Sequence, residues 1–227
     1  MFFDAGETLI HPQPSFPTLF SRVMADEGHP VEPSAVEAAA GLVARHFDEA
    51  ARDGRRWTTS PERSRAFWAS VYRTFLEALG IPDSEELHVR LYATFSDPCN
   101  YGLFPDVAPV LADLDVRGYA MGVISNFEAW LDTLLERLEV GALLPVRAIS
   151  GVEGVEKPDP ALFRVALERA GVDAAECAYV GDNPAFDMEP AAALGMFPVL
   201  IDRHDRHPAS PHTRITSMAD LPAVLGA

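Results

Sequence analysis

The strongest constraint on the fold is the alternation of short apolar runs with segments of helix length in the C-terminal half. The apolar runs have the length of buried strands: Ala120–Ser125, Val146–Ser150, Ala178–Gly181 and Phe197–Ile201. Amphipathic segments typical of helices lie between them, at residues 107–117, 128–138, 160–171 and 185–195. Asp159-Pro160 marks a helix start, and Gly171 and Gly195 mark helix ends. This alternation predicts an α/β fold with a doubly wound parallel sheet, a Rossmann-like core.

The region from residue 15 to 97 has a different pattern. It contains no convincing strand and predicts helices over 16–28, 34–53, 61–80 and 84–96. A short apolar run at the N-terminus precedes it, so an all-helical domain inserted after the first strand explains the order best. We therefore expect a Rossmann-like core formed by 1–14 plus 98–227 and an inserted helical domain formed by 15–97. The polar stretch 203–214 is expected to be a surface loop.

Charge and cysteine content limit the functional classes. Lys and Arg number 18 against 34 Asp and Glu, a formal net charge of −16. Binding to nucleic acid or to an anionic membrane requires clustered basic residues, so neither is expected. No apolar window is long enough to span a bilayer, and Cys99 and Cys177 are too far apart in sequence to suggest a metal knuckle. These features predict a cytoplasmic protein whose partner is a small molecule.

Polar residues follow several of the predicted strands. Asp4, Ser125 and Asp182 each end an apolar run, Asp187 comes five residues after Asp182, and Lys157 precedes a helix. In a parallel sheet these positions meet at the carboxyl edge, where α/β folds bind ligands. Carboxylates that converge there repel one another unless a cation joins them, and a small set of oxygen ligands suits Mg²⁺. Each residue alone is more often a cap or a turn; their joint occurrence favours phosphoryl transfer.

Four motifs in this order resemble those of the haloacid dehalogenase-like hydrolase superfamily. They are Phe2 to Leu9, Val123 to Asn126, Glu156 to Pro160 and Val180 to Asp187. The family's helical cap falls where residues 15 to 97 lie, so the resemblance spans the whole chain. It implies a hydrolase, most simply a phosphatase that acts on a small phosphorylated metabolite.

The resemblance also implies a nucleophile and a Mg²⁺ site. Asp4 would become an aspartyl-phosphate during turnover and would also bind Mg²⁺. The backbone carbonyl of Gly6 and the carboxylate of Asp182 would complete the protein's metal ligands. Residues behind these ligands would support them: Thr8, Asn183 and Asp187.

The phosphoryl group would be bound by residues of the middle two motifs. The resemblance assigns phosphoryl oxygens to Ser125 and to the backbone N–H of Asn126. Lys157 would neutralise charge between the phosphoryl group and the carboxylates. It is the chain's only lysine, and a compact point charge suits this position.

The chain departs from the family pattern at Gly6. Phosphatases of the family typically have a second Asp here, which acts as general acid and base. Such a group contributes about 10²–10⁴-fold to the rate, so its absence predicts slow turnover of alkyl phosphates. Glu7 is not expected to substitute, because its side chain should point elsewhere.

Two other functions stay open. Dehalogenases of the family also lack the second Asp and need no metal, although their last motif typically lacks the Gly-Asp pair found here as Gly181-Asp182. A weakly active or non-catalytic phosphate-binding protein is the other alternative, and Gly6 is its best support. Phosphonate cleavage through a cap lysine is excluded, because the predicted cap contains no lysine.

Overall fold

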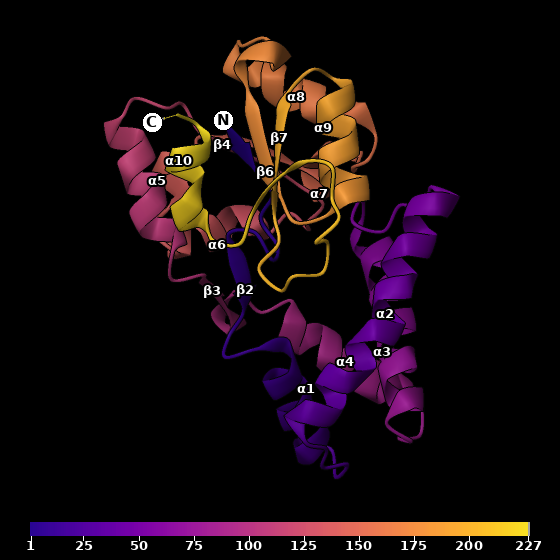
Figure 1. Ribbon diagram of the computed structural model, residues 1–227. Coiled ribbons are helices and arrows are strands. Elements are labelled where there is room, and N and C mark those ends of the chain that lie inside the picture. The colour runs from indigo at the N-terminus through magenta and orange to yellow at the C-terminus, as the bar shows by residue number, and fades with distance from the viewer. Residues whose placement is uncertain (227) are drawn as a thin grey trace. The chain divides into compact units, whose positions relative to one another are not determined.

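The computed structural model describes residues 1–226, except for the side chains of residues 44, 48 and 51. The described chain divides into two compact units (Figure 1). The core unit consists of Met1–Ile10 and the chain from Leu103 onward, and the helical unit consists of His11–Gly102. None of the helices in the described range is sufficiently long and apolar for a membrane span.

The core unit contains a six-stranded sheet in which every pairing is parallel, in the order β5-β4-β1-β6-β7-β8. The strands are β1 Phe2–Phe3, β4 Gly122–Ser125, β5 Val146–Ile149, β6 Ala178–Gly181, β7 Phe197–Ile201 and β8 Thr213–Ile215. Its helices are α5 Val107–Val116, α6 Leu131–Arg137, α7 Ser150–Glu153, α8 Pro160–Ala170, α9 Glu189–Ala193 and α10 Leu221–Val224. The predicted α/β fold with a parallel sheet is confirmed.

Both faces of this sheet are covered. Phe2, Tyr179 and Leu200 share one buried cluster with residues of α8 and α9. Strand residues alternate between faces, and Phe3 and Val180 on the opposite face are also fully buried. Figure 1 shows α5 and α10 to one side of the strands and α8 and α9 to the other.

The helical unit consists of α1 Phe16–Asp26, α2 Pro33–Asp53, α3 Pro61–Ala78 and α4 Glu85–Phe95. The hydroxyls of Ser15, Ser60 and Ser84 accept backbone N–H groups at the starts of α1, α3 and α4, as N-caps do. Its interior is rich in aromatic side chains; Phe16, for example, stacks on Phe95 with ring centroids 4.5 Å apart. The four predicted helices are therefore present.

Three short strands differ from the sequence expectation. β2 Ile10–Pro12 pairs with β3 Tyr101–Leu103 where the chain passes between the two units. The end of the polar stretch 203–214 is not loop, because β8 begins at Thr213 and pairs with β7. Each of these strands has only three residues, too few for an alternating pattern to be recognised in sequence.

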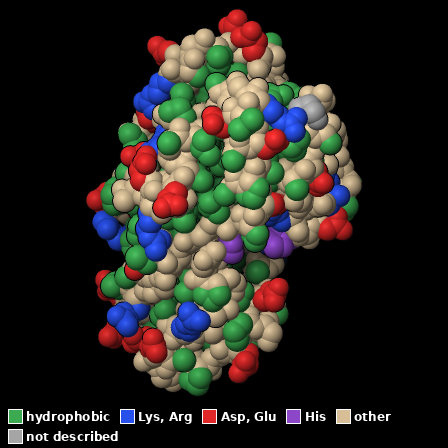
Figure 2. Space-filling view, turned by 90° about the vertical axis from the view of Figure 1, so that its left-hand side faces the viewer, with side chains coloured by type: hydrophobic (Ala, Val, Ile, Leu, Met, Phe, Trp, Pro, Cys, Tyr) green, Lys and Arg blue, Asp and Glu red, His purple; other side chains and the backbone are tan. Residues whose placement is uncertain are grey.

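The surface view shows a mixed distribution of charge. On the face drawn in Figure 2, acidic and basic side chains lie interspersed among apolar and polar ones. The described residues form no extended basic patch on this face. Despite the high net charge, the surface shown there offers local mixtures of both signs.

Candidate active site

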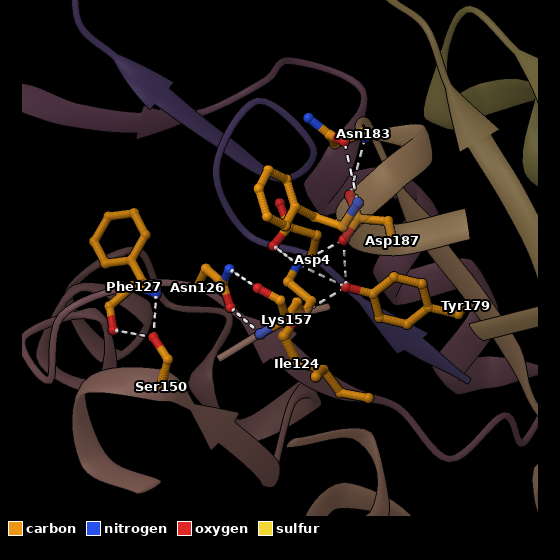
Figure 3. A network of polar contacts seen from close by, with 10 residues as sticks. Asp4, Ile124, Asn126, Phe127, Ser150, Lys157, Tyr179, Asn183 and Asp187 are labelled. Atoms are coloured by element: carbon orange, nitrogen blue, oxygen red, sulfur yellow. Dashed lines mark hydrogen bonds and ion pairs between the residues drawn. The ribbon is translucent and has the colours of Figure 1, made fainter. Parts of the chain in front are cut away.

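The candidate site is built around one buried lysine. The Nζ atom of Lys157 donates to Asp4 Oδ1 at 2.7 Å, to Asp187 Oδ1 at 2.6 Å and to the Tyr179 hydroxyl at 3.0 Å. The Lys157 side chain is 3% exposed, so these contacts lie away from bulk solvent. Figure 3 shows the four side chains converging from different segments of the core unit.

The sheet places the two carboxylates that follow its strands. Asp4 comes directly after β1, and its backbone N–H donates to the carbonyl of Val180 in the neighbouring strand at 2.8 Å. Asp182 comes directly after β6. Because β1 and β6 are paired and parallel, both residues emerge at the same edge.

Asp187 reaches the site through a local irregularity. A single helix was expected over 185–195, but residues Pro184–Met188 form a π-helical turn that precedes α9. The Oδ2 atom of Asp187 accepts the backbone N–H of Asn183 at 2.9 Å, while Oδ1 faces Lys157. π-Helical turns occur frequently at functional sites, where they redirect a side chain.

Gly181 makes room for this arrangement. A Cβ atom at Gly181 would lie 2.5 Å from Cγ of Asp187, closer than any real Cβ contact. The absence of a side chain at this residue therefore lets Asp187 pack directly against the end of β6.

The site holds more negative than positive charge. Carboxylate oxygens of Asp4, Asp182 and Asp187 lie within 4.8 Å of one another. Although burial alone would lower the pKa of Lys157, Asp187 and Asp4 raise it above its ordinary value, so the lysine stays charged. One ammonium beside three carboxylates leaves a site suited to a further cation.

Burial and mutual repulsion change the carboxyl pKa values. Burial raises the pKa of Asp4, against the opposing effect of the Lys157 ammonium. The pKa of Asp182 is raised well above its ordinary range by burial and then by the charges of Asp187, Asp4 and Glu7. No hydrogen bond or ion pair reaches the Asp182 carboxylate among the residues that the structure describes.

Ser125 and Asn126 have different relations to the site. Ser125 ends β4, is 1% exposed, and its hydroxyl has no hydrogen-bond partner among the described residues. The Asn126 side chain pairs with the backbone of Lys157: its Nδ2 donates to the carbonyl at 2.8 Å, and its Oδ1 accepts the N–H at 2.6 Å. Asn126 therefore fixes the segment that carries the lysine, a role its sequence position did not reveal.

The remaining predicted residues lie in the adjoining loops. Thr8 is fully buried, and its carbonyl accepts from Arg203 Nη2 at 2.9 Å. The Asn183 side chain caps the π-helical turn by accepting the N–H groups of the residues two and three positions ahead. Gly6 has open space beside it, because an added Cβ would meet only a ring carbon of Phe127 at 4.0 Å.

Tyr179 was missed in the sequence. It lies in the run Ala178–Gly181 and is fully buried, so its apolar neighbours suggested only a core residue. Two signals were available: buried tyrosine hydroxyls require a partner, and Tyr179 shares a strand face with Gly181, which precedes the Asp182 motif.

Comparison with known proteins identifies the family of the chain. Residues 1–195 match the family model described as haloacid dehalogenase-like hydrolase. The chain belongs to this hydrolase family. The resemblance expected from the four motifs is thus confirmed, and with it the hydrolase class.

Relatives of this haloacid dehalogenase-like hydrolase include a protein named only for the family and a protein named as a phosphatase. It is 28% identical to haloacid dehalogenase-like hydrolase domain-containing protein 3 of Danio rerio, over 99% of this chain and 95% of that protein. It is 36% identical to a phosphoserine phosphatase of Thermus thermophilus, over 73% of this chain and 70% of that protein. A solved Bacillus subtilis structure, the putative HAD-hydrolase YfnB, shares the fold with a TM-score of 0.79 at 15% identity, covering 100% of this chain and 97% of that one.

Proposed function

We propose that this hydrolase is a Mg²⁺-dependent phosphatase that acts on a small phosphorylated metabolite through an aspartyl-phosphate at Asp4. The observation that carries the proposal is the cluster of Asp4, Asp182 and Asp187 beside a single lysine. A halide-displacing enzyme has no use for a carboxylate such as Asp182, which has no counter-charge of its own. Similarity to a protein named phosphoserine phosphatase supports phosphoryl transfer as well.

The donor set fits Mg²⁺. Carboxylate oxygens of Asp4 and Asp182, together with the backbone carbonyl of Gly6, are the hard oxygen ligands that this ion prefers. The Asp182 carboxylate has no hydrogen bond or ion pair within the described chain, so its oxygens are available to bind a cation. When bound, Mg²⁺ would offset the negative charge that otherwise repels a phosphate from Asp4.

The chain's own residues supply the remaining chemistry. The Asp4 carboxylate attacks phosphorus, the bond to the leaving oxygen breaks, and water then cleaves the aspartyl-phosphate to release phosphate and regenerate Asp4. Lys157 fixes the orientation of Asp4 by binding Oδ1. The Ser125 hydroxyl, buried and without a partner, donates to a phosphoryl oxygen.

Leaving-group choice follows from Gly6, which has no proton to give. Solvent must protonate the leaving oxygen, so acetyl phosphate and aryl phosphates, whose leaving groups need little protonation, should be cleaved faster than alkyl phosphates.

We assign the enzyme to the cytoplasm, since both cysteines are free thiols.

Phosphate release from acetyl phosphate, an aryl phosphate and an alkyl phosphate, with and without Mg²⁺, tests the proposal. We expect Mg²⁺-dependent turnover in that order of leaving groups, and a loss to below about one thousandth in Asp4→Asn. Mass spectrometry of wild type quenched during turnover should locate a phosphoryl group on Asp4.

The matched control is Asp113→Asn, which changes an exposed carboxylate of α5 paired with Arg117 and should retain full turnover. Failure of wild type to release phosphate from all three compounds contradicts the proposal. Metal-independent halide release from a 2-haloacid would then identify the dehalogenase alternative.

A further inference from the structure

We propose that Tyr179 is a positioning residue for catalysis, which acts by holding Lys157 in register with Asp4. This inference rests on the proposed function, because it assigns Tyr179 a part in the attack by Asp4. Tyr179 lies in β6, the strand next to β1, and Asp4 directly follows β1. Phe2 of β1 is the partner of Tyr179 in the sheet register.

The argument begins with the hydrogen-bond capacity of the lysine. An ammonium group has three N–H donors and no acceptor. Lys157 directs its donors to Asp4 at 2.7 Å, to Asp187 at 2.6 Å and to the Tyr179 hydroxyl at 3.0 Å. The set is complete, and Tyr179 is its only uncharged member.

The tyrosine hydroxyl is itself anchored. It donates to the carbonyl of Ile124 in β4 at 2.8 Å, and Asp187 Oδ1 lies 3.0 Å away as a second acceptor. Its ring is fully buried and packs edge-on against Phe163, with centroids 5.1 Å apart. The third acceptor of Lys157 is therefore fixed by two strands, as Figure 3 shows.

The proton arrangement makes the hydroxyl difficult to replace. A hydroxyl offers one proton and two lone pairs, so the Tyr179 oxygen can donate and accept at the same time. In this way it bridges the Ile124 carbonyl, which needs a donor, and the Lys157 ammonium, which needs an acceptor. Phenylalanine would leave the Ile124 carbonyl without a donor and one Lys157 N–H without an acceptor.

Those two unsatisfied groups would attract each other. In the absence of the hydroxyl, we expect the ammonium of Lys157 to move toward the Ile124 carbonyl, which carries it away from Asp4. Small displacements of a charged group near reacting atoms reduce the rate of the chemical step strongly. Because Ser125 is not among the partners of the Tyr179 hydroxyl, we expect substrate binding to change little.

The test is Tyr179→Phe with acetyl phosphate and Mg²⁺ as substrate and metal. We expect kcat to fall about 10-fold while KM stays within about twofold, since the lost interaction belongs to the transition state. The control is Tyr119→Phe, which removes a hydroxyl from the same unit outside this network and should change neither constant. Unchanged kcat in Tyr179→Phe overturns the inference, and so does a loss that falls on KM, which would indicate displacement of Ser125 instead.

A second measurement needs no activity. Melting temperatures of wild type, Tyr179→Phe, Lys157→Met and the double variant form a cycle. If the hydroxyl acts on Lys157, Tyr179→Phe lowers the melting temperature less in the Lys157→Met background than in wild type. Equal shifts in the two backgrounds overturn the inference. Absence of phosphatase activity in wild type, by contrast, would reject the proposed function and leave this contact to be judged by the cycle.

Discussion

Asp182 and Asp202 each come directly after one of two neighbouring strands, yet their surroundings are opposite. Each directly follows a strand, β6 or β7, and these strands are paired and parallel. Asp202 accepts the backbone N–H groups of Arg206 and His207 at 2.8 Å each, and Nε of Arg214 at 2.9 Å. The Asp182 carboxylate has no such donor within the described part of the chain.

The pKa values of the two carboxyls shift in opposite directions. Burial raises the pKa of Asp182, and the nearby charges of Asp187 and Asp4 raise it further. Burial also acts to raise the pKa of Asp202, but hydrogen bonds from His207, Arg206 and Arg214 outweigh it and the pKa is lowered. The protein's own donors stabilise the charge of Asp202, whereas none reaches Asp182 in the described part of the chain, in keeping with its proposed role as a metal ligand. We therefore expect the donors around each carboxylate, rather than its place after a strand, to distinguish a structural Asp from a functional one.

Within this comparison, the largest effect is expected when the two residues are neutralised one at a time. Asp182→Asn should reduce Mg²⁺-dependent phosphate release by at least about 10²–10³-fold without lowering stability, because it removes a source of repulsion. Asp202→Asn should keep kcat within about threefold but lower the free energy of unfolding by about 1–3 kcal/mol, since hydrogen bonds to a charged acceptor are weakened. Steady-state kinetics and urea unfolding of both variants provide the measurement.

The distinction is contradicted if Asp202→Asn loses activity or if Asp182→Asn loses stability but not activity. Loss of activity in a stable Asp202→Asn protein would mean that the second carboxylate also serves the reaction. Destabilisation of Asp182→Asn without loss of turnover would mean that Asp182 is structural and that the metal site lies elsewhere.

A smaller effect is expected one residue earlier on the same two strands. Gly181→Ala places a Cβ atom where the Asp187 carboxyl group now lies, so Asp187 must move away from Lys157. We expect a loss of about 10²-fold in kcat from the misplaced network and a destabilisation of about 1–3 kcal/mol from overpacking. A comparison variant in the buried part of β7 is Ile201→Val, which should cost about 0.5–1.5 kcal/mol with full turnover. Full activity of Gly181→Ala would mean that catalysis does not depend on the position of Asp187.

The sequence predicts the fold well where physical periodicity is strong. The runs Ala178–Gly181 and Phe197–Ile201 match β6 and β7 residue for residue, because a buried parallel strand must be apolar on both faces. It fails at β2, β3 and β8, whose three-residue pairings depend on which segment lies alongside. It also missed the π-helical turn, since ordinary helical periodicity does not show where Asp187 turns inward.

The candidate site follows the same division. The parallel sheet rule predicted that Asp4 and Asp182 would meet at one edge, and their carboxylates do lie close together. The rule gave no information on partners: Tyr179 against Lys157 and Arg214 against Asp202 are contacts between segments distant in sequence. Whether a carboxylate finds a donor depends on the folded surroundings, which the sequence pattern does not show. The catalytic roles of Asp4 and Asp182 are therefore predictions.

The smallest predicted effect is a pH dependence of stability that belongs to Asp202. Its folded-state pKa is lowered, so its stabilising contribution is complete above the unfolded-state value, about 3.9, and is lost as pH falls through the folded-state value. The free energy of unfolding of wild type, measured by urea titration, should therefore fall between about pH 5 and pH 3 by more than that of Asp202→Asn. Asp113→Asn, in which an exposed carboxylate is changed, should follow wild type. Equal slopes for wild type and Asp202→Asn would mean that the donors around Asp202 hold it no better than water does, and its contrast with Asp182 would then rest on geometry alone.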